Sequence, residues 1–334
     1  MPPIMVTGGA GYIGSHIVRA LRERGRPHIV LDNLSEGHAA AVNGSELVVC
    51  ELSDRGALAS ALRRHKVEWI IHMAANCLVG ESMSEPEKYW GNNVASGLGL
   101  LEEARRAGVR GIVFSSSAAV YGEPLQVPIE EDAPCQPTNV YGETKLVFER
   151  ALASYHAAYG FQSVCLRYFN AAGAAEDGLL GEDHARETHL IPLVLCAALG
   201  VRPPVTVLGT DYPTPDGTGI RDYIHVEDLA EAHLLALEAL ESARIGFDAL
   251  NLGGGEGKSV REVIDLAASI AARPIPTIEG PRRPGDPAVL VASSGRARKR
   301  LGWRPTRSDL PRIIETAWRW HRAHSRGFGD PPAA

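Results

Sequence analysis

Tyr141 and Lys145 have the spacing of a proton-transfer pair. They are four residues apart within Val140–Tyr159, which has the pattern of a helix, so both side chains face the same side of it. A free phenol has a pKa of about 10 and is a poor base near neutral pH, but neighbouring positive charge lowers that pKa. The pair therefore predicts a tyrosine that removes a proton from a hydroxyl group. A Tyr four residues before a Lys also occurs by chance, so the spacing alone leaves a structural role open.

A run of hydroxyl side chains, Ser115–Ser117, follows a short apolar segment that begins at Gly111. The segment has the pattern of a buried strand, and doubly wound sheets bind ligands at the carboxyl ends of their strands. Ser117 is therefore a candidate to hydrogen-bond a reacting group beside the tyrosine. A plain polar loop is the structural alternative.

Gly8, Gly11 and Gly14 follow the first apolar run and open a helical pattern that starts near Ile13. Glycines at this spacing permit a tight turn, a close backbone approach to a pyrophosphate and close packing of helix on strand. The helix N-terminus adds N–H donors for the same pyrophosphate. The arrangement predicts a dinucleotide site, with a glycine-rich turn that binds nothing as the alternative.

Asp32 ends the second apolar run, about 20 residues after the glycine turn. A carboxylate there can accept hydrogen bonds from both ribose hydroxyls of adenosine and repels a 2′-phosphate, which favours NAD over NADP. The charge of an oxidised nicotinamide would add to that of Lys145 in lowering the pKa of Tyr141. Asp32 with Asn33 is also compatible with simple turn chemistry.

Short apolar runs alternate with helical patterns in the first half of the chain, as expected for βαβ units. Right-handed crossovers then favour an α/β fold with a doubly wound, Rossmann-like parallel sheet. The expected strands are Ile4–Thr7, His28–Asp32, Glu46–Glu51, Val67–Met73, Gly111–Ser115 and Ser163–Tyr168. The expected helices are Ile13–Glu23, Arg55–Arg64, Tyr89–Ala107 and Val140–Tyr159.

Regular alternation stops after Asn170. We expect a Rossmann domain of residues 1–172 plus 222–253 and a smaller mixed α/β domain of residues 173–221 plus 254–330, with a ligand in the crevice between them. The expected later elements are loops at Gly173–Glu187 and Arg202–Gly219, strands at Tyr223–Val226 and Phe247–Leu252, and helices at Leu190–Leu199, Glu227–Leu240, Val260–Ala271 and Leu310–His324.

The composition is that of an ordinary globular protein of 334 residues with 45% hydrophobic residues. A net charge of -6 provides no broad basic surface for nucleic acid. The start carries no charged leader and no run reaches the roughly 18 apolar residues that span a bilayer, so we expect no membrane partner and a cytoplasmic location. Scattered cysteines without a Cys-x-x-Cys pair fit neither a disulfide framework nor a zinc site, so we expect reduced thiols and no metal. They are Cys50, Cys77, Cys135, Cys165 and Cys196.

Together these residues resemble the extended branch of the short-chain dehydrogenase/reductase superfamily and, within it, the UDP-galactose 4-epimerases. The resemblance covers nearly the whole chain. Its most specific part is Asp211–Val226, with the core Asp-Gly-Thr-Gly-Ile-Arg-Asp-Tyr-Ile-His. The other matching segments are Thr7–Ser15, Val79–Ser82, Ser115–Gly122, Tyr141–Lys145, Arg167–Asn170 and Arg283–Asp286.

The resemblance implies interconversion of UDP-galactose and UDP-glucose, with bound NAD, through a 4-keto sugar. Tyr141 would take the proton from the sugar O4, Ser117 would hydrogen-bond O4, and Lys145 would bind the nicotinamide ribose and lower the tyrosine pKa. A homodimer is also implied, with helices around Asn92–Ala107 and Val140–Tyr159 packing across the twofold axis. The alternative is that their apolar faces serve only the core of one chain.

The resemblance also assigns the residues that would hold the two ligands. Asn170 and Arg221 would bind the diphosphate, Arg283 a phosphate and Asp286 the uridine ribose, which suits guanidinium and carboxylate chemistry. Internal ion pairs, Arg221 with Asp222 and Arg283 with Asp286, are the alternative. The expected cofactor residues are Gly8, Gly11, Tyr12, Ile13, Gly14, Asp32, Asn33, Glu51, Leu52, Asn92, Ser115, Tyr141, Lys145 and Tyr168. The expected substrate residues are Ser117, Tyr141, Asn170, His189, Arg221, Arg283, Asp286 and Leu290.

Four places depart from the family pattern. Glu51-Leu52 stands where an Asp is common at the adenine edge, His189 where an Asn often reaches the substrate, and Cys77 where some relatives have Lys. Leu290 occupies the position that limits room beside the sugar 2-substituent. It is neither the small residue linked with N-acetyl sugars nor the aromatic linked with their exclusion. We expect unacetylated UDP-glucose and UDP-galactose as substrates.

Three other functions fit parts of the pattern. A nucleotide-sugar 4,6-dehydratase would carry an acidic pair after the fifth strand, where this chain has Ala118-Ala119. A UDP-glucuronate 4-epimerase stays open, because the sequence names no pocket for or against a sugar carboxylate. A non-catalytic NAD-binding regulator would be expected to have lost Tyr141 or Lys145, and both are present.

Overall fold

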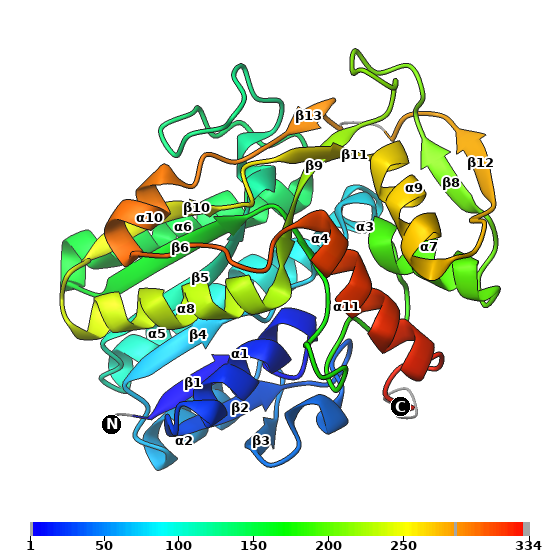
Figure 1. Cartoon of the computed structure of the whole chain (residues 1–334). Coiled ribbons are helices and arrows are strands. Elements are labelled where there is room, and N and C mark those ends of the chain that lie inside the picture. The colour runs from blue at the N-terminus through cyan, green and yellow to red at the C-terminus, as the bar shows by residue number, and fades with distance from the viewer. Residues whose placement is uncertain (1–2, 284–285, 330–334) are drawn as a thin grey trace.

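A seven-stranded parallel sheet forms the centre of the larger part of the molecule (Figure 1). The computed structural model describes residues 3–283 and 286–329. The strand order is β3-β2-β1-β4-β5-β6-β10, so the chain starts near the middle, runs outward to β3 and then crosses to β4. This order confirms the doubly wound, Rossmann-like α/β fold. The strands are β1 (Ile4–Thr7), β2 (His28–Asp32), β3 (Glu46–Val49), β4 (Trp69–His72), β5 (Gly111–Ser117), β6 (Gln162–Tyr168) and β10 (Phe247–Leu252).

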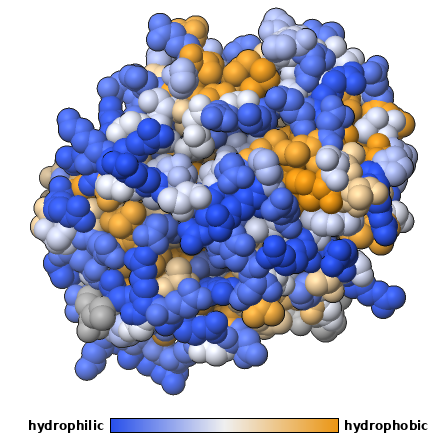
Figure 2. Space-filling view, in the orientation of Figure 1, coloured by the Kyte–Doolittle hydropathy of each residue, from blue (hydrophilic) through white to orange (hydrophobic). Residues whose placement is uncertain are grey.

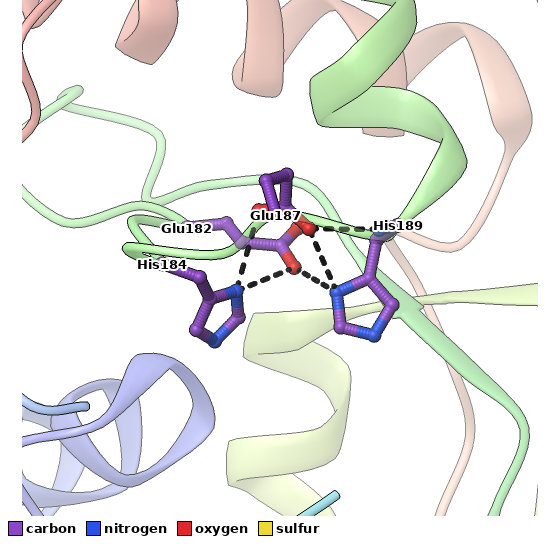
Figure 3. A group of neighbouring side chains, drawn as sticks. All are labelled: Glu182, His184, Glu187 and His189. Carbon is purple, nitrogen blue, oxygen red and sulfur yellow. Dashed lines mark hydrogen bonds and ion pairs between the residues drawn. The ribbon is translucent and has the colours of Figure 1, made fainter. Parts of the chain in front are cut away.

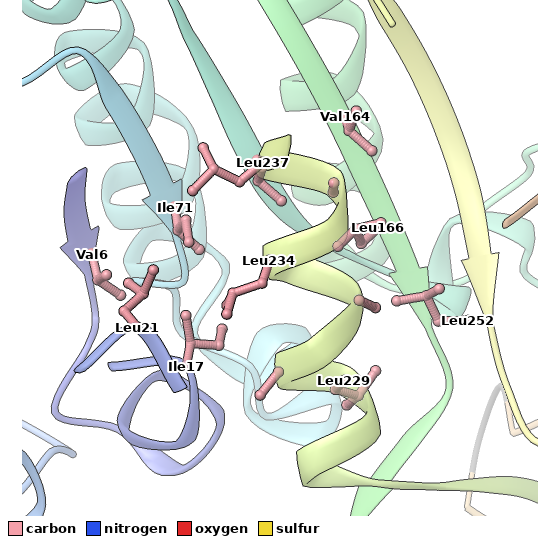
Figure 4. Packing of buried hydrophobic residues seen from close by; sticks show 14 of the residues in the cluster. Val6, Ile17, Leu21, Ile71, Val164, Leu166, Leu229, Leu234, Leu237 and Leu252 are labelled. Carbon is pink, nitrogen blue, oxygen red and sulfur yellow. The ribbon is translucent and has the colours of Figure 1, made fainter. Parts of the chain in front are cut away.

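Helices bury both faces of this sheet, which explains why its strands are nearly continuous apolar runs. On one face, leucines of α8 fill the space between α1 and the strands, as Leu234 and Leu237 show in Figure 4. The opposite face is covered by α2, α5 and α6 around a second core. These helices are α1 (Tyr12–Glu23), α2 (Arg55–Arg64), α5 (Gly97–Arg106), α6 (Val140–Tyr159) and α8 (Val226–Glu241).

The helix expected over residues 89–107 is interrupted by a wider turn. The chain passes from α4 (Pro86–Tyr89) through a π-helix (Trp90–Ser96) into α5. Asn93 lies buried in that π-helix, where its amide donates to the carbonyl of Asn76 at 2.9 Å and accepts from the Asn76 N–H at 2.9 Å. This pairing with a distant loop is tertiary, so the periodicity of the sequence does not reveal it. Just before it lies α3 (Val79–Ser84), a short helix that the sequence analysis did not predict.

The smaller part of the molecule has its own sheets and its own core. A four-stranded sheet joins β7, β9, β11 and β13, and β8 pairs with β12. Its helices α7, α9 and α11 pack together, and hydrophobic residues gather on that side of the surface in Figure 2. The strands are β7 (Asn170–Ala172), β8 (Val205–Leu208), β9 (Ile220–His225), β11 (Gly257–Ser259), β12 (Thr277–Gly280) and β13 (Val289–Leu290). The helices are α7 (Leu190–Leu199), α9 (Val260–Ala271) and α11 (Leu310–Ala323).

The two parts interleave more than the expected domain limits suggest. The limit at residue 222 falls inside β9, and β7, whose residues lie within the expected Rossmann domain, pairs with β9 in the small sheet. Helix α10 (Gly295–Leu301) lies within the expected second domain but packs, with Trp303, into the core of the large sheet. The expected limits at residues 1 and 330 lie outside the described residues.

Short 3-10 helices occur at Ala39–Val42 and at Ala118–Tyr121, directly after β5. In the described part of the chain, no helix combines the length and the hydropathy that crossing a bilayer requires.

Candidate active site

A cavity of about 550 Å³ lies at the carboxyl ends of the parallel strands and extends under the smaller part of the molecule. Its wall contains every residue that the sequence analysis named for cofactor, substrate or catalysis. These are Gly8, Gly11, Tyr12, Ile13, Gly14, Asp32, Asn33, Glu51, Leu52, Asn92, Ser115, Ser117, Tyr141, Lys145, Tyr168, Asn170, His189, Arg221, Arg283, Asp286 and Leu290. Segments from residue 8 to residue 290 therefore meet around one space.

The glycine turn forms one end of the cavity. Gly8 has a φ of +68°, and a Cβ there would lie 2.5 Å from the backbone nitrogen of Ala74. A Cβ on Gly14 would lie 2.2 Å from the carbonyl oxygen of Gly8. Both positions therefore exclude any side chain, so the first turn of α1 packs directly on the loop that precedes it. The result is a backbone surface with free room for a pyrophosphate at a helix N-terminus.

Asp32 lies beside this turn and is almost fully buried. Its carboxylate accepts the N–H groups of Ala10 and Leu34, both at 2.9 Å, and burial raises its pKa. An ionised carboxylate offers about four acceptor positions, so Asp32 retains capacity to accept from a ribose hydroxyl. Asn33 donates to both carboxylate oxygens of Glu51, at 3.0 and 3.1 Å, and closes this edge of the cavity. These residues fit a dinucleotide without a 2′-phosphate.

Tyr141 and Ser117 meet in the middle of the cavity. Tyr141 lies in the first turn of α6 and Ser117 at the end of β5. The Ser117 hydroxyl accepts the N–H of Ala119 at 3.1 Å and lies beside the Tyr141 phenol on the cavity wall. Burial raises the pKa of Tyr141 above its usual range, while the nearby Ser117 side chain acts in the opposite direction.

Lys145 lies one helical turn after Tyr141, as its spacing predicts. Its Nζ donates to the carbonyl oxygen of Ser115 at 2.7 Å and lies 5.6 Å from the centre of the Tyr141 ring. Burial lowers the pKa of Lys145 to about 8. Lowering of the Tyr141 pKa by Lys145 together with an oxidised nicotinamide remains a prediction, since burial is the largest influence on that pKa in the chain alone.

Several buried polar contacts hold this centre in place. The Asn139 side chain caps α6 by accepting the N–H of Gly142 at 2.8 Å, which fixes the turn that carries Tyr141. The hydroxyls of Ser115 and Tyr168 are hydrogen-bonded across β5 and β6. Asn92, in the π-helix, donates to the side-chain oxygen of Asn93 at 3.1 Å.

The opposite end of the cavity is built by the small sheet. In its registers Asn170 lies opposite Tyr223 and Leu290 lies opposite Arg221, which brings three segments of the chain together. The Arg221 guanidinium binds the carboxylate of Asp286 at 2.5 Å. The sequence left two ion pairs open, Arg221 with Asp222 and Arg283 with Asp286. Neither forms among the described residues. Asp222 instead accepts backbone N–H groups, from Gly254 at 2.7 Å and from Gly255 and Ala292 at 3.0 Å. Residues 284 and 285, between Arg283 and Asp286, lie outside the described residues.

His189 lies directly before α7 and belongs to a charged cluster that the sequence analysis did not find. Its Nδ1 lies 2.5 Å from a carboxylate oxygen of Glu182, and His184 and Glu187 complete the cluster. Burial acts to lower the pKa of His184, but bonds to both carboxylates raise it to about 10. Glu182, His184 and Glu187 were visible in the sequence, but within the segment Gly173–Glu187 that we expected to be a loop, and His189 was named only as a substrate residue.

A second unpredicted cluster borders the cavity at Glu81. Its carboxylate binds Lys88 at 3.0 Å and Arg186 at 3.7 Å, so it links α3 to the loop before α7. The pKa of Glu81 is lowered by the hydrogen bonds from Tyr89 and Lys88. Cys77, one of five free cysteines, is exposed on the same wall.

Comparison with known proteins identifies the family. Residues 4–253 match the NAD dependent epimerase/dehydratase family. The UDP-glucose 4-epimerase of Halalkalibacterium halodurans is 51% identical over 326 residues, which are 97% of each chain. The UDP-glucose 4-epimerase of Streptomyces lividans is 50% identical over 330 residues, which are 98% of each chain.

Solved structures show the same likeness. The UDP-glucose 4-epimerase of Brucella ovis in complex with NAD superposes with a TM-score of 0.92 at 45% identity, covering 95% of this chain and 98% of that one. The enzyme of Bifidobacterium longum in complex with NAD⁺ and UDP superposes with a TM-score of 0.93 at 38% identity, covering 98% and 100%. Since sequence and fold agree over nearly the whole length, this chain belongs to the NAD dependent epimerase/dehydratase family.

Proposed function

We propose that the protein interconverts UDP-galactose and UDP-glucose by inverting the configuration at C4 through a 4-keto sugar. One observation carries the proposal: Tyr141 and Ser117 line the same cavity, between the glycine turn at one end and Arg221 at the other. The similar proteins named UDP-glucose 4-epimerase, two of them solved with NAD, support the same reaction and cofactor. We also propose the two domains expected from the sequence. Residues 1–172 plus 222–253 form the Rossmann domain that binds NAD, and residues 173–221 plus 254–330 form the domain that binds the UDP-sugar.

In this proposal Tyr141 removes the proton from the sugar O4 and later returns it, with Ser117 holding O4 by a hydrogen bond. NAD, when bound, supplies the acceptor and donor of the C4 hydride. Burial raises the pKa of Tyr141, so positive charge from Lys145 and from bound NAD⁺ would be needed to make the phenolate available as a base. Lys145 binds the nicotinamide ribose.

The remaining wall residues are proposed as ligand contacts. Asp32 binds the adenosine ribose, while Asn33, Glu51 and Leu52 border the adenine and the glycine turn binds the pyrophosphate. Tyr12, Ile13, Asn92, Ser115 and Tyr168 complete the cofactor site. Asn170, Arg221 and Arg283 bind the UDP diphosphate, which suits their donor groups. Asp286 binds the uridine ribose, His189 contacts the substrate, and Leu290 limits space beside the sugar 2-substituent.

We propose a homodimer formed by the π-helix, α5 and α6. Trp90 and Leu98 on the first two elements are 40% and 37% exposed, and Tyr159 at the end of α6 is 60% exposed. Light scattering on the purified protein is expected to give twice the chain mass, and Leu98→Glu is expected to lower it towards the monomer. We also propose a cytoplasmic location, which the five unpaired cysteines support.

The deciding experiment is an assay of the purified protein with UDP-galactose and no added cofactor, following UDP-glucose formation. NAD released on denaturation is measured in the same sample. Conversion with bound NAD supports the reaction and the cofactor together. Bound NAD without conversion would reject the substrate, and UDP-glucuronate and N-acetylated UDP-sugars would then be tested in the same assay.

A further inference from the structure

Four side chains converge on one point in the loop before α7 (Figure 3). Glu182, His184 and Glu187 come from the loop itself, and His189 is the residue directly before the helix. Each offers one nitrogen or oxygen atom, and these four atoms all lie within 4.8 Å of one another. Both histidines present the same ring nitrogen, Nδ1, to the common point.

Several separations in this cluster match the spacing of ligands around one metal ion. His184 Nδ1 lies 3.4 Å from Glu182 Oε1 and 3.3 Å from Glu187 Oε2, and His189 Nδ1 lies 3.3 Å from Glu187 Oε1. Two ligands at about 2.0–2.1 Å from a tetrahedral Zn²⁺ are about 3.3–3.4 Å apart. His189 Nδ1 and Glu182 Oε1 are hydrogen-bonded at 2.5 Å, so this pair would have to separate to admit an ion.

Charge and burial favour a cation at the common point. The side chains of Glu182 and Glu187 are only 3% and 7% exposed. Two carboxylates withdrawn from water require nearby positive charge, which the two histidines supply when protonated and which one divalent ion would supply in place of those protons. Two imidazoles with two carboxylates form a donor set that suits zinc and similar transition metals.

Neighbouring groups already orient the donors. One carboxylate oxygen of Glu187 accepts the backbone N–H groups of Thr188 and His189, both at 2.7 Å. The His184 ring meets the Tyr12 ring edge-on, with centres 6.4 Å apart. Outer contacts of this kind fix ligand direction before a metal arrives.

We propose that Glu182, His184, Glu187 and His189 bind one divalent transition-metal ion, best matched by Zn²⁺, in the wall of the cavity. Because four protein ligands close the coordination of a tetrahedral ion, the role is structural. The ion fastens the loop that precedes α7 to the start of that helix. This inference concerns the loop alone and does not depend on the reaction proposed above.

The test titrates Zn²⁺ alone into the full-length protein after removal of metals by a chelator, with calorimetry as the readout. The wild-type protein is expected to bind one equivalent and to unfold at a higher temperature when Zn²⁺ is present. X-ray absorption of that sample is expected to show only nitrogen and oxygen ligands. Absence of saturable binding in the wild-type protein overturns the proposal.

His184→Gln and Glu187→Gln are each expected to weaken Zn²⁺ binding by about 100-fold or more and to abolish the thermal shift. The matched control is His65→Gln, which removes a histidine whose Nε2 pairs with Glu46 at 3.6 Å, outside the cluster. Circular dichroism and the unfolding temperature of each metal-free variant establish that it folds. Equal binding by the folded variants and the control would overturn the assigned ligands. Since no readout is epimerase activity, failure here leaves the proposed reaction untouched, and the converse also holds.

Discussion

The two ends of the cavity are built by different means. At the glycine turn the wall is backbone, packed so closely that Gly8 and Gly14 leave no room for a methyl group. At the other end the wall consists of charged side chains bound to one another, as Arg221 is to Asp286. A backbone wall is fixed before any ligand arrives. A wall of ion pairs must give up or share contacts when a ligand binds. Its contribution to ligand affinity therefore depends on charge rather than on shape.

The largest effect is expected between the two ends, at Tyr141. Tyr141→Phe removes the proposed proton acceptor while keeping the ring that fills the site. Because acid–base groups contribute about 10²–10⁴-fold to rates, kcat is expected to fall by about 10³-fold with little change in stability or bound NAD. Tyr159→Phe, on the same helix but 60% exposed, is the matched control. Turnover equal to that of the control would eliminate the assigned mechanism.

One added methyl group at the glycine turn is expected to lower both the free energy of unfolding and the affinity for NAD. Gly14→Ala places a Cβ 2.2 Å from the Gly8 carbonyl oxygen, whereas Gly11→Ala places one at an ordinary 3.4 Å from the same atom. Overpacking of this kind costs about 1–3 kcal/mol. Gly14→Ala is therefore expected to lower the free energy of unfolding by about 2 kcal/mol and to weaken NAD binding, as measured by urea unfolding and cofactor titration. If Gly11→Ala proves equally damaging, close packing is not what shapes this wall.

A substitution at the charged end is expected to weaken binding of the UDP-sugar and to leave NAD binding unchanged. Hydrogen bonds to charged groups contribute about 1.5–3 kcal/mol, so Arg221→Ala is expected to raise the KM for the UDP-sugar by about 10- to 100-fold. NAD affinity is expected to stay the same. Arg282→Ala is the control, since that side chain binds Asp211 at 2.7 Å away from the cavity wall. Loss of NAD affinity in Arg221→Ala would mean that the two ends are not separate.

Acid is expected to lower the free energy of unfolding through four buried histidines. Burial lowers the pKa of His72 to about 3 and of His16, His225 and His233 to about 4. The folded protein therefore binds fewer protons than the unfolded chain, whose histidines titrate near 6.5. The stability that these residues contribute is complete above pH 6.5 and is lost as the pH falls towards 4.

From pH 7 to pH 5 the loss is about 2 kcal/mol for each of these histidines, which urea unfolding at several pH values measures. His233→Gln removes one group and is expected to make the dependence on pH less steep by about one proton. An unchanged slope would show that His233 is not the neutral, buried group described above.

The parts of the site that depend on neighbours in the chain could be predicted from the sequence. The spacing of Gly8, Gly11 and Gly14 after an apolar run is enough to specify a tight turn at a helix start, and the structure has that turn. Helix geometry likewise places Tyr141 and Lys145 on one face, and both border the cavity. The doubly wound class of fold follows from alternation of strands and helices and from right-handed crossovers, whereas the order of the strands comes from the structure.

Contacts between distant segments were decided only by the tertiary structure. Arg221 could have paired with its neighbour Asp222, but the loops of the smaller part bring backbone N–H groups to Asp222, and the arginine binds Asp286 instead. The pKa of Tyr141 follows the same principle, since its largest influence is burial by all the segments around the site, which the sequence does not reveal. Spacing fixes which side of a helix or strand a residue faces. Its partners and its hydration depend on every segment that packs around it.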